Sequence, residues 1–128
     1  QYASYYEFAI INSYAHMAWM RFTSGRLESR YRYSKDLVYN TFPWPSPSDG
    51  QKSKIEQTGK NILEARSHFP DWTLAELYDD LMMPIELRQA HQENDAAVED
   101  AYGTSWSSES ACVEDLLRRY QLLINGLN

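Results

Sequence analysis

The residues best suited to bind a ligand lie in the stretch from Arg21 to Lys35. It holds five basic residues and one acidic residue, a net charge of +4, and is called the basic strip below. Arginine presents a planar fork of donors that matches phosphate or guanine, and tyrosine can stack on a base or bond a phosphate. The candidate nucleic-acid contacts are Arg21, Arg26, Arg30, Tyr31, Arg32, Tyr33 and Lys35.

The spacing of these residues suits a two-faced segment. In an extended chain, "RYRY" directs Arg30 and Arg32 to one face and Tyr31 and Tyr33 to the other. A nucleic-acid backbone could lie on the first face while the second anchors in a core. Arginines that bridge to acids on neighbouring surfaces would give the same pattern, so both interpretations stay open.

No pattern in the chain indicates catalysis or metal binding. The five glycines are isolated, no Cys/His pair has zinc spacing, and no serine lies in a G-x-S-x-G motif. The acid pairs Asp79-Asp80 and Glu99-Asp100 consist of neighbours that point to different sides of a helix. We therefore predict no catalytic, cofactor-binding or metal-binding residue, and no enzyme activity for this chain alone.

The elements around the basic strip must position it. Apolar spacing predicts a mostly buried helix over Tyr5–Phe22, ended by Gly25. Alternating aromatic and β-branched residues over Tyr31–Phe42 favour extended chain. The proline-rich "FPWPSPSDG" continues as an extended strap, and we expect the rings of Phe42 and Trp44 to cover a core.

The remainder of the chain is predicted to be helical. A last helix, capped by Ser107 or Ser108, carries an apolar stripe that needs a partner. We therefore predict a mostly α fold: a small helical bundle with a short extended or β strap after the first helix. The earlier expected helices are Ser53–His68, a short one capped by Thr73 with Glu76 in a capping box, and one from Pro84 to Gly103. The stripe of the last helix is Val113, Leu116, Leu117, Tyr120, Leu123, Ile124 and Leu127.

Composition sets the frame for these elements. The 128 residues, 43% hydrophobic and 14% aromatic, are typical of one folded domain. The net charge is −6, and residues 46–128 hold seven basic and fifteen acidic residues, which indicates a basic strip on an acidic body. The single cysteine, Cys112, is expected to be a buried hydrophobe in a reducing, cytoplasmic setting, and no apolar stretch is long enough to span a membrane. A start at Gln1, inside a structured pattern, favours a piece of a longer protein.

The stretch "NSYAHMAWMRFTSGRLESRYRYSKDLVYNTFPWP", Asn12 to Pro45, closely resembles a segment near the C-terminus of the MmeI-like DNA methyltransferases. In that family an "HMAWMR" helix runs into "GRL", "YRYS" and "LVYN.FPWP". The later stretches "KIEQTGKNILEAR" and "TLAELYDDLMMPIELRQAHQENDAAVEDAYG" follow the family's order as well. The resemblance covers nearly the whole chain.

The resemblance implies a place in a large bifunctional restriction–modification protein. Family members carry a nuclease, a helical connector, an S-adenosylmethionine-dependent adenine N6-methyltransferase, a target recognition domain and a C-terminal helical domain. Residues 1–45 would end the recognition region and residues 46–128 would form the C-terminal helical domain. The cofactor loop and the N-P-P-[YF] motif lie upstream in the family, so no catalytic residue is implied here.

The expected function is therefore that of a C-terminal fragment. It would support the recognition domain and contact the backbone of double-stranded DNA, with the upstream methyltransferase and recognition domains as further partners and S-adenosylmethionine bound by the parent. The alternative is a purely structural helical module without DNA contact. A third interpretation, an independent helical interaction module, would require a native chain start near Gln1.

Overall fold

A computed structural model describes residues 4–27 and 41–126, with side chains for residues 4–24 and 41–126. These residues form six helices and no strand, which confirms the predicted mostly α fold. The helices are α1 (Tyr5–Ile11), α2 (Tyr14–Leu27), α4 (Asp49–Ser67), α5 (Leu74–Leu77), α6 (Ile85–Tyr102) and α7 (Glu109–Gly126). Within this part of the chain, no helix combines the length and apolar character that a membrane span needs.

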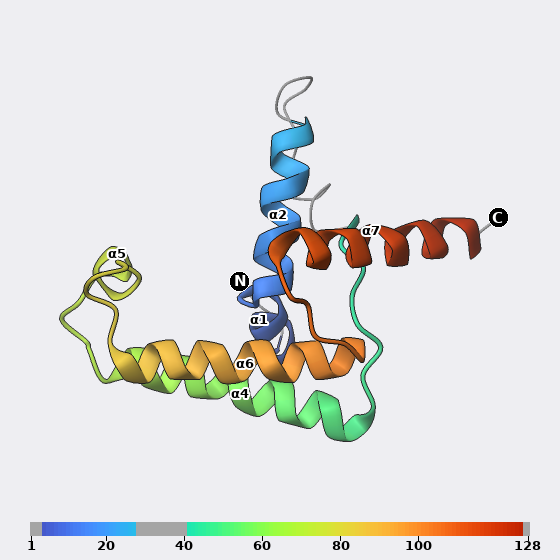
Figure 1. Ribbon diagram of the computed structural model, residues 1–128. Helices are drawn as coiled ribbons and strands as arrows, with labels where there is room; N and C mark the ends of the chain where they lie inside the picture. Colours follow the sequence, from blue (N-terminus) through green and yellow to red (C-terminus); the bar gives the residue numbers. More distant parts are fainter. Residues whose placement is uncertain (1–3, 28–40, 127–128) are drawn as a thin grey trace.

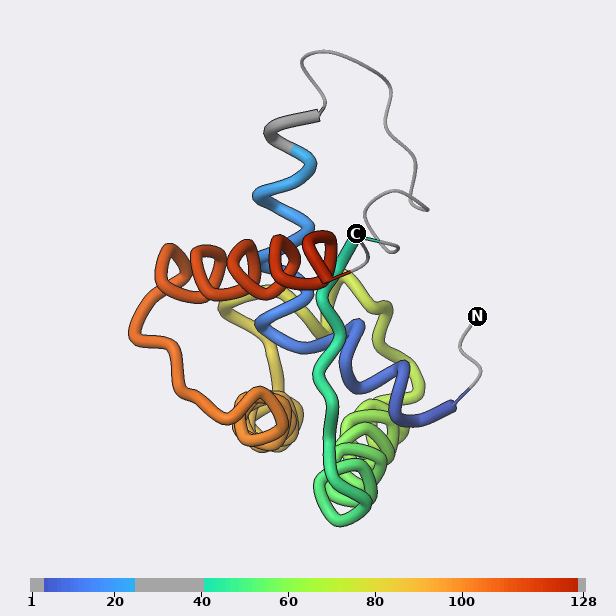
Figure 2. The backbone as a smooth tube through the Cα atoms, turned by 90° about the vertical axis from the view of Figure 1, so that its right-hand side faces the viewer, coloured from blue at the N-terminus to red at the C-terminus, as the bar shows by residue number. Residues whose placement is uncertain are grey.

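The long helices α4 and α6 lie side by side and form the base of the molecule (Figure 1). Helix α1 packs on α4, while α2 rises steeply from this base and is crossed by α7. Residues 43–48 run as an extended strap past the second half of α7 down to the start of α4 (Figure 2). Of the segment Tyr31–Phe42 predicted to be extended, only Thr41 and Phe42 are described; the prediction is wrong at Thr41, which has a helical backbone.

Local capping signals explain several helix ends. Thr73 Oγ1 accepts from the Glu76 amide at 3.1 Å, and Glu76 Oε1 accepts from the Thr73 amide at 2.8 Å, which confirms the predicted capping box. A second box, between Ser48 and Gln51, starts α4 at Asp49, earlier than the predicted Ser53. Each box satisfies two backbone N–H groups, of the N-cap residue and of the residue three positions later, that would otherwise lack a partner in the protein.

The last two helices also begin and end as their sequences suggest. Gly103 ends α6 at φ 78°, in the left-handed region that favours glycine. Ser108 Oγ accepts from the Ala111 amide at 3.1 Å, so Ser108 rather than Ser107 caps α7.

The predicted single helix over Tyr5–Phe22 is wrong: the chain forms two helices that break at Asn12 and Ser13. The fully buried Ser13 hydroxyl donates to the Ile10 carbonyl at 2.7 Å and competes with helix continuation. Nor does Gly25 end the second helix, which continues to Leu27.

Two apolar cores hold the helices together. The larger core draws on α1, α2, the strap, α4, α6 and α7, so it contains residues from both ends of the chain. The smaller one lies between α1, α4, α5 and α6. The larger core comprises Ala9, Ile10, Ala15, Ala18, Trp19, Phe42, Ile55, Ala97, Val98, Tyr102, Cys112, Val113 and Leu116, and the smaller one comprises Phe8, Ile62, Ala65, Leu77, Leu87 and Ala90.

The expectation that α7 buries its whole stripe is only half correct. Val113 and Leu116 are buried, but Leu123 and Ile124 are exposed. The second half of α7 extends past α2, as Figure 1 shows; Tyr120 still packs on Trp19 of α2 and Arg119 still contacts Tyr102 at the end of α6, whereas Leu123 and Ile124 project beyond these contacts. Leu127 lies outside the described residues.

Gly59 allows the close packing of α1 on α4. A Cβ atom at Gly59 would lie 2.8 Å from the Tyr5 carbonyl oxygen and 3.0 Å from Ala9 Cβ. Gly59→Ala should therefore lower the free energy of unfolding by about 1–3 kcal/mol, although alanine favours helix. Gly50, in the same helix, has no atom within 4 Å of such a Cβ. Gly50→Ala is thus the matched control, expected to add about 0.5 kcal/mol in urea unfolding; equal effects of the two changes would refute the close contact.

Candidate nucleic-acid interface

The structure describes only one side chain of the predicted nucleic-acid contacts, that of Arg21 on α2. The remaining members lie outside the residues whose side chains are described: Arg26, Arg30, Tyr31, Arg32, Tyr33 and Lys35. Their role stays a prediction. The structure does describe α2, the helix on which the basic strip begins, and the helices that pack against it.

Arg21 forms a bidentate ion pair with Glu109 at the start of α7. Its Nη2 donates to Oε1 at 2.8 Å and its Nε to Oε2 at 3.1 Å. The side-chain hydrogen bonds raise the pKa of Arg21 and lower the pKa of Glu109. The side chains are 51% and 45% exposed, so water screens the pair and its net contribution to stability is small. The pair is the kind of contact that the structural alternative for the basic strip requires.

An open groove of about 440 Å³ adjoins this ion pair between α2 and α7. Phe22, Val113 and Leu117 form its apolar wall, and Glu109 and Glu114 contribute acidic side chains. The acidic side makes the groove unsuited to a phosphate unless Arg21 leaves Glu109.

The N-terminus of α2 is capped from a distant helix. Asp95 on α6 accepts the Tyr14 amide at 2.9 Å. The start of a helix carries unpaired N–H groups and a partial positive charge, and a carboxylate satisfies both. Asp95 thereby fixes where α2 begins relative to α6.

Polar contacts at two further points join the first 46 residues to the rest of the chain. Asn94 Nδ2 donates to the Ala9 carbonyl at 2.9 Å, while its Oδ1 accepts from the Thr58 hydroxyl at 2.7 Å. Tyr102 donates its hydroxyl proton to the Pro43 carbonyl in the strap at 2.7 Å. We call the whole set of contacts between residues 5–46 and 47–126 the N–C interface.

Aromatic rings fill the N–C interface. Trp19 and Phe42 are 2% and 3% exposed and meet edge to face, with ring centroids 6.3 Å apart. As predicted for the strap, Phe42 covers the core, and Trp44 packs against it. Trp19 also approaches Tyr120 of α7, at 6.0 Å between centroids. The strap and α2 are therefore held by the same helices.

His16 is buried within this aromatic cluster. Its ring lies edge to face on Phe42 at 4.9 Å, and among the described residues neither ring nitrogen has a hydrogen-bond partner. Burial lowers the pKa of His16, so the ring is neutral at pH 7. It acts as a flat packing group, and it coordinates nothing that the structure describes.

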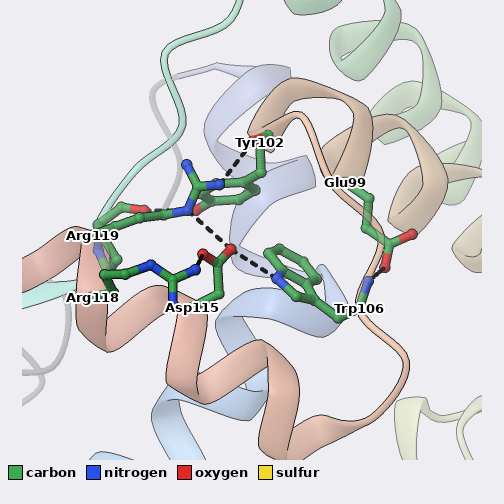
Figure 3. A network of polar contacts seen from close by, with 7 residues as sticks. Glu99, Tyr102, Trp106, Asp115, Arg118 and Arg119 are labelled. Atoms are coloured by element: carbon green, nitrogen blue, oxygen red, sulfur yellow. Dashed lines mark hydrogen bonds and ion pairs between the residues drawn. The ribbon is translucent and has the colours of Figure 1, made fainter.

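A polar network holds the loop between α6 and α7 (Figure 3). Asp115 accepts from Trp106 Nε1 at 2.9 Å and from Arg119 Nε at 3.0 Å, and it also pairs with Arg118. Arg119 Nη2 in turn donates to the Tyr102 carbonyl at 2.9 Å. Burial works to raise the pKa of Asp115, but these donors outweigh it and lower that pKa below its ordinary value. The network fixes the middle of α7 against the end of α6 and the loop that joins the two helices.

Comparison with known proteins identifies the two parts of this interface. The sequence model described as the MmeI C-terminal domain matches residues 47–128, and the model described as the MmeI target recognition domain matches residues 1–46. The chain belongs to the MmeI family. The resemblance inferred from "HMAWMR", "GRL" and "FPWP" is thereby confirmed.

The chain spans less than a fifth of the length of two relatives that it matches. It is 43% identical over 120 residues to DNA methyltransferase A of Bacillus subtilis (strain 168), covering 93% of this chain and 14% of that protein. It also superposes on the Type IIL restriction–modification enzyme MmeI, solved in complex with DNA, with a TM-score of 0.86 and 46% identity. That match covers 96% of this chain and 17% of the solved one.

The polar residues of the N–C interface were largely missed by sequence reasoning. Asn94 carried a usable signal, because an asparagine within an apolar helical stripe is expected to find a buried partner. Asp95 and Glu109 carried none, because each looks like an ordinary surface acid until the partner from the first helices is placed beside it.

The Asp95 cap should make stability depend on pH. Burial, with a smaller effect of the Glu99 charge, raises the pKa of Asp95 to about 6. A raised carboxyl pKa gives stability that is present below the ordinary value near 4 and lost as pH rises through 6. Asp95→Asn keeps an acceptor oxygen without the charge. We compare the free energy of unfolding of Asp95→Asn with that of the unaltered chain by urea unfolding. The difference, variant minus unaltered chain, should increase by on the order of 2 kcal/mol between pH 4 and pH 7, because only the unaltered chain loses stability as Asp95 ionises.

Asp95→Ala is the control, because it removes the acceptor as well. It should be less stable than Asp95→Asn at every pH in this window. If the asparagine variant follows the pH profile of the unchanged chain, Asp95 is not the titrating cap.

Proposed function

We propose that this chain is the C-terminal part of a DNA N6-adenine methyltransferase of a restriction–modification system. In this proposal residues 46–128 support the end of the recognition region, residues 1–45, and hold its basic strip in position to contact the DNA backbone. The observation that carries the proposal is the shared core, in which Trp19 and Phe42 pack among residues of α6 and α7.

The supporting role follows from rigidity. Asp95 fixes the start of α2, and the packing of the buried Trp19 against Tyr120 of α7 holds a point further along it. Figure 1 shows that the C-terminal end of α2 extends away from α4 and α6. The sequence continues from that end into the rest of the basic strip. A rigid α2 would therefore transmit the position of the body to the residues that meet DNA.

The catalytic steps are assigned elsewhere in the proposed parent. The sequence contains neither a glycine-rich loop nor an N-P-P-[YF] motif, so the proposal assigns S-adenosylmethionine binding and methyl transfer to the rest of the parent. A cytoplasmic location and an endonuclease activity in the parent belong to the same proposal.

The ion pair of Arg21 with Glu109 favours the second candidate, a structural module without DNA contact. It satisfies one member of the strip within the chain itself. If the other arginines are satisfied in the same way by neighbouring domains, their loss would reduce stability and leave DNA binding unaffected.

DNA binding by the longer protein separates the two candidates. Arg30→Gln combined with Arg32→Gln should weaken binding to a duplex and reduce the slope of log K against log salt by about 2, because two phosphate contacts are lost. The measurement is a titration of labelled duplex at several salt concentrations.

The control removes two cations of the acidic body, Lys54→Gln with Arg88→Gln, and should leave the salt slope unchanged. An unaltered slope in the Arg30 and Arg32 variant, together with reduced thermal stability, would contradict DNA contact and support the structural module.

A further inference from the structure

Residues 71–86 form an acidic finger at one end of the α4–α6 pair, comprising α5, its connections and the first two residues of α6. They contain five acidic residues and no basic one. All five acidic side chains are exposed: Asp71, Glu76, Asp79, Asp80 and Glu86. Figure 1 places α5 well away from α7 and from the projecting end of α2.

The acidic finger is held in a defined conformation. Tyr78 accepts from Arg66 Nε at 2.9 Å, and its hydroxyl lies 2.7 Å from His91 Nε2. Burial, together with the charge of Arg66, lowers the pKa of His91 to about 4, so the ring is neutral and its Nε2 accepts a hydrogen bond from the Tyr78 hydroxyl. Leu77 is buried in the smaller core. These contacts anchor the finger from α4 and α6.

The tip nevertheless presents large apolar side chains to solvent. Leu81 is 97% exposed, Ile85 is 73% exposed and Met82 is 49% exposed. Asp79 Oδ1 accepts the Leu81 amide at 2.8 Å and the Met82 amide at 3.2 Å, which fixes the turn that carries them. A fixed turn with adjoining exposed apolar side chains marks an interaction site rather than a random surface.

We infer that the tip of the acidic finger docks into an apolar pocket rimmed by lysine or arginine on another domain of the same polypeptide. Apolar burial of Leu81 and Ile85 would supply the attraction, and the carboxylates around them would select a basic rim. The inference rests on the proposal that the chain is the end of a longer protein, because it needs a domain beyond this one.

The charge of the finger excludes other occupants. Glu86 pairs with His68, and Arg88 donates to the Asp80 carbonyl, but the five carboxylates of the finger still outnumber these basic groups. The remaining negative charge would repel DNA and an anionic lipid surface. A second copy joined finger to finger by a two-fold axis would bring two acidic rims together. A protein surface that combines an apolar pocket with basic residues matches both the apolar tip and the acidic residues of the finger.

Met82 supplies a natural probe of docking. In the longer protein without DNA, peroxide should oxidise Met82 at least about tenfold more slowly than in the Leu81→Glu variant, because oxidation follows exposure. Asp71→Lys combined with Asp80→Lys should speed the oxidation as well, because it opposes the basic rim. Peptide mass spectrometry over a time course gives the rates.

Leu63→Glu is the matched control, since Leu63 is also an exposed leucine, at 37%, but lies on α4 outside the finger. It should leave the Met82 rate unchanged. Rapid oxidation of Met82 in the unaltered protein, protection that appears only when DNA is added, or protection that survives the lysine changes would each overturn the inference.

The DNA contact of the basic strip and the docking of the acidic finger are tested by separate measurements, so one can be refuted without the other. The salt slope of DNA binding reports the basic strip, whereas Met82 oxidation without DNA reports the finger. Protection of Met82 alongside an unaltered salt slope would therefore leave the docking inference intact while removing the proposed DNA contact.

Discussion

The burial of α2 and the strap by the later helices is the interaction on which the rest of the structure depends. Trp19 and Phe42 are almost fully buried in a core that includes residues of α6 and α7. Full burial of side chains of this size contributes about 2–3 kcal/mol each. The first 46 residues and the later ones thus form one packing unit, although they match two different family models.

The polar contacts give this apolar packing its direction. Apolar burial alone would tolerate α2 sliding or turning in its groove, because it is not directional. Asp95 accepts a hydrogen bond from the first amide of α2. Asn94 donates to a carbonyl of α1, and the Tyr102 hydroxyl donates to a carbonyl of the strap. The carboxylate of Asp95 is half-buried, and the partial loss of hydration that raises its pKa disfavours the charged form. This cost accompanies a defined orientation of α2.

The sequence predicted those features that depend on residues close together in the chain. The Thr73 capping box, the Gly103 stop and the apolar face of α7 each depend on residues a few positions apart, so they could be predicted. The break at Ser13 was missed because a hydroxyl that bonds back to the helix looks like any serine in the sequence. The exposure of Leu123 and Ile124 was missed for a different reason: periodicity reveals an apolar face and does not say whether another element covers it. Of the candidate DNA contacts, only Arg21 has a described side chain, and its partner Glu109 lies 88 residues away.

The most direct measurement is native-state hydrogen exchange of the chain across a series of denaturant concentrations. If the N–C interface makes one packing unit, the slowest amides around Trp19 in α2 will open with the same free energy and denaturant dependence as those around Val98 in α6 and Leu116 in α7. Amides of α2 that open at a clearly lower free energy, with little denaturant dependence, would contradict a shared core and leave the later helices without their supporting role.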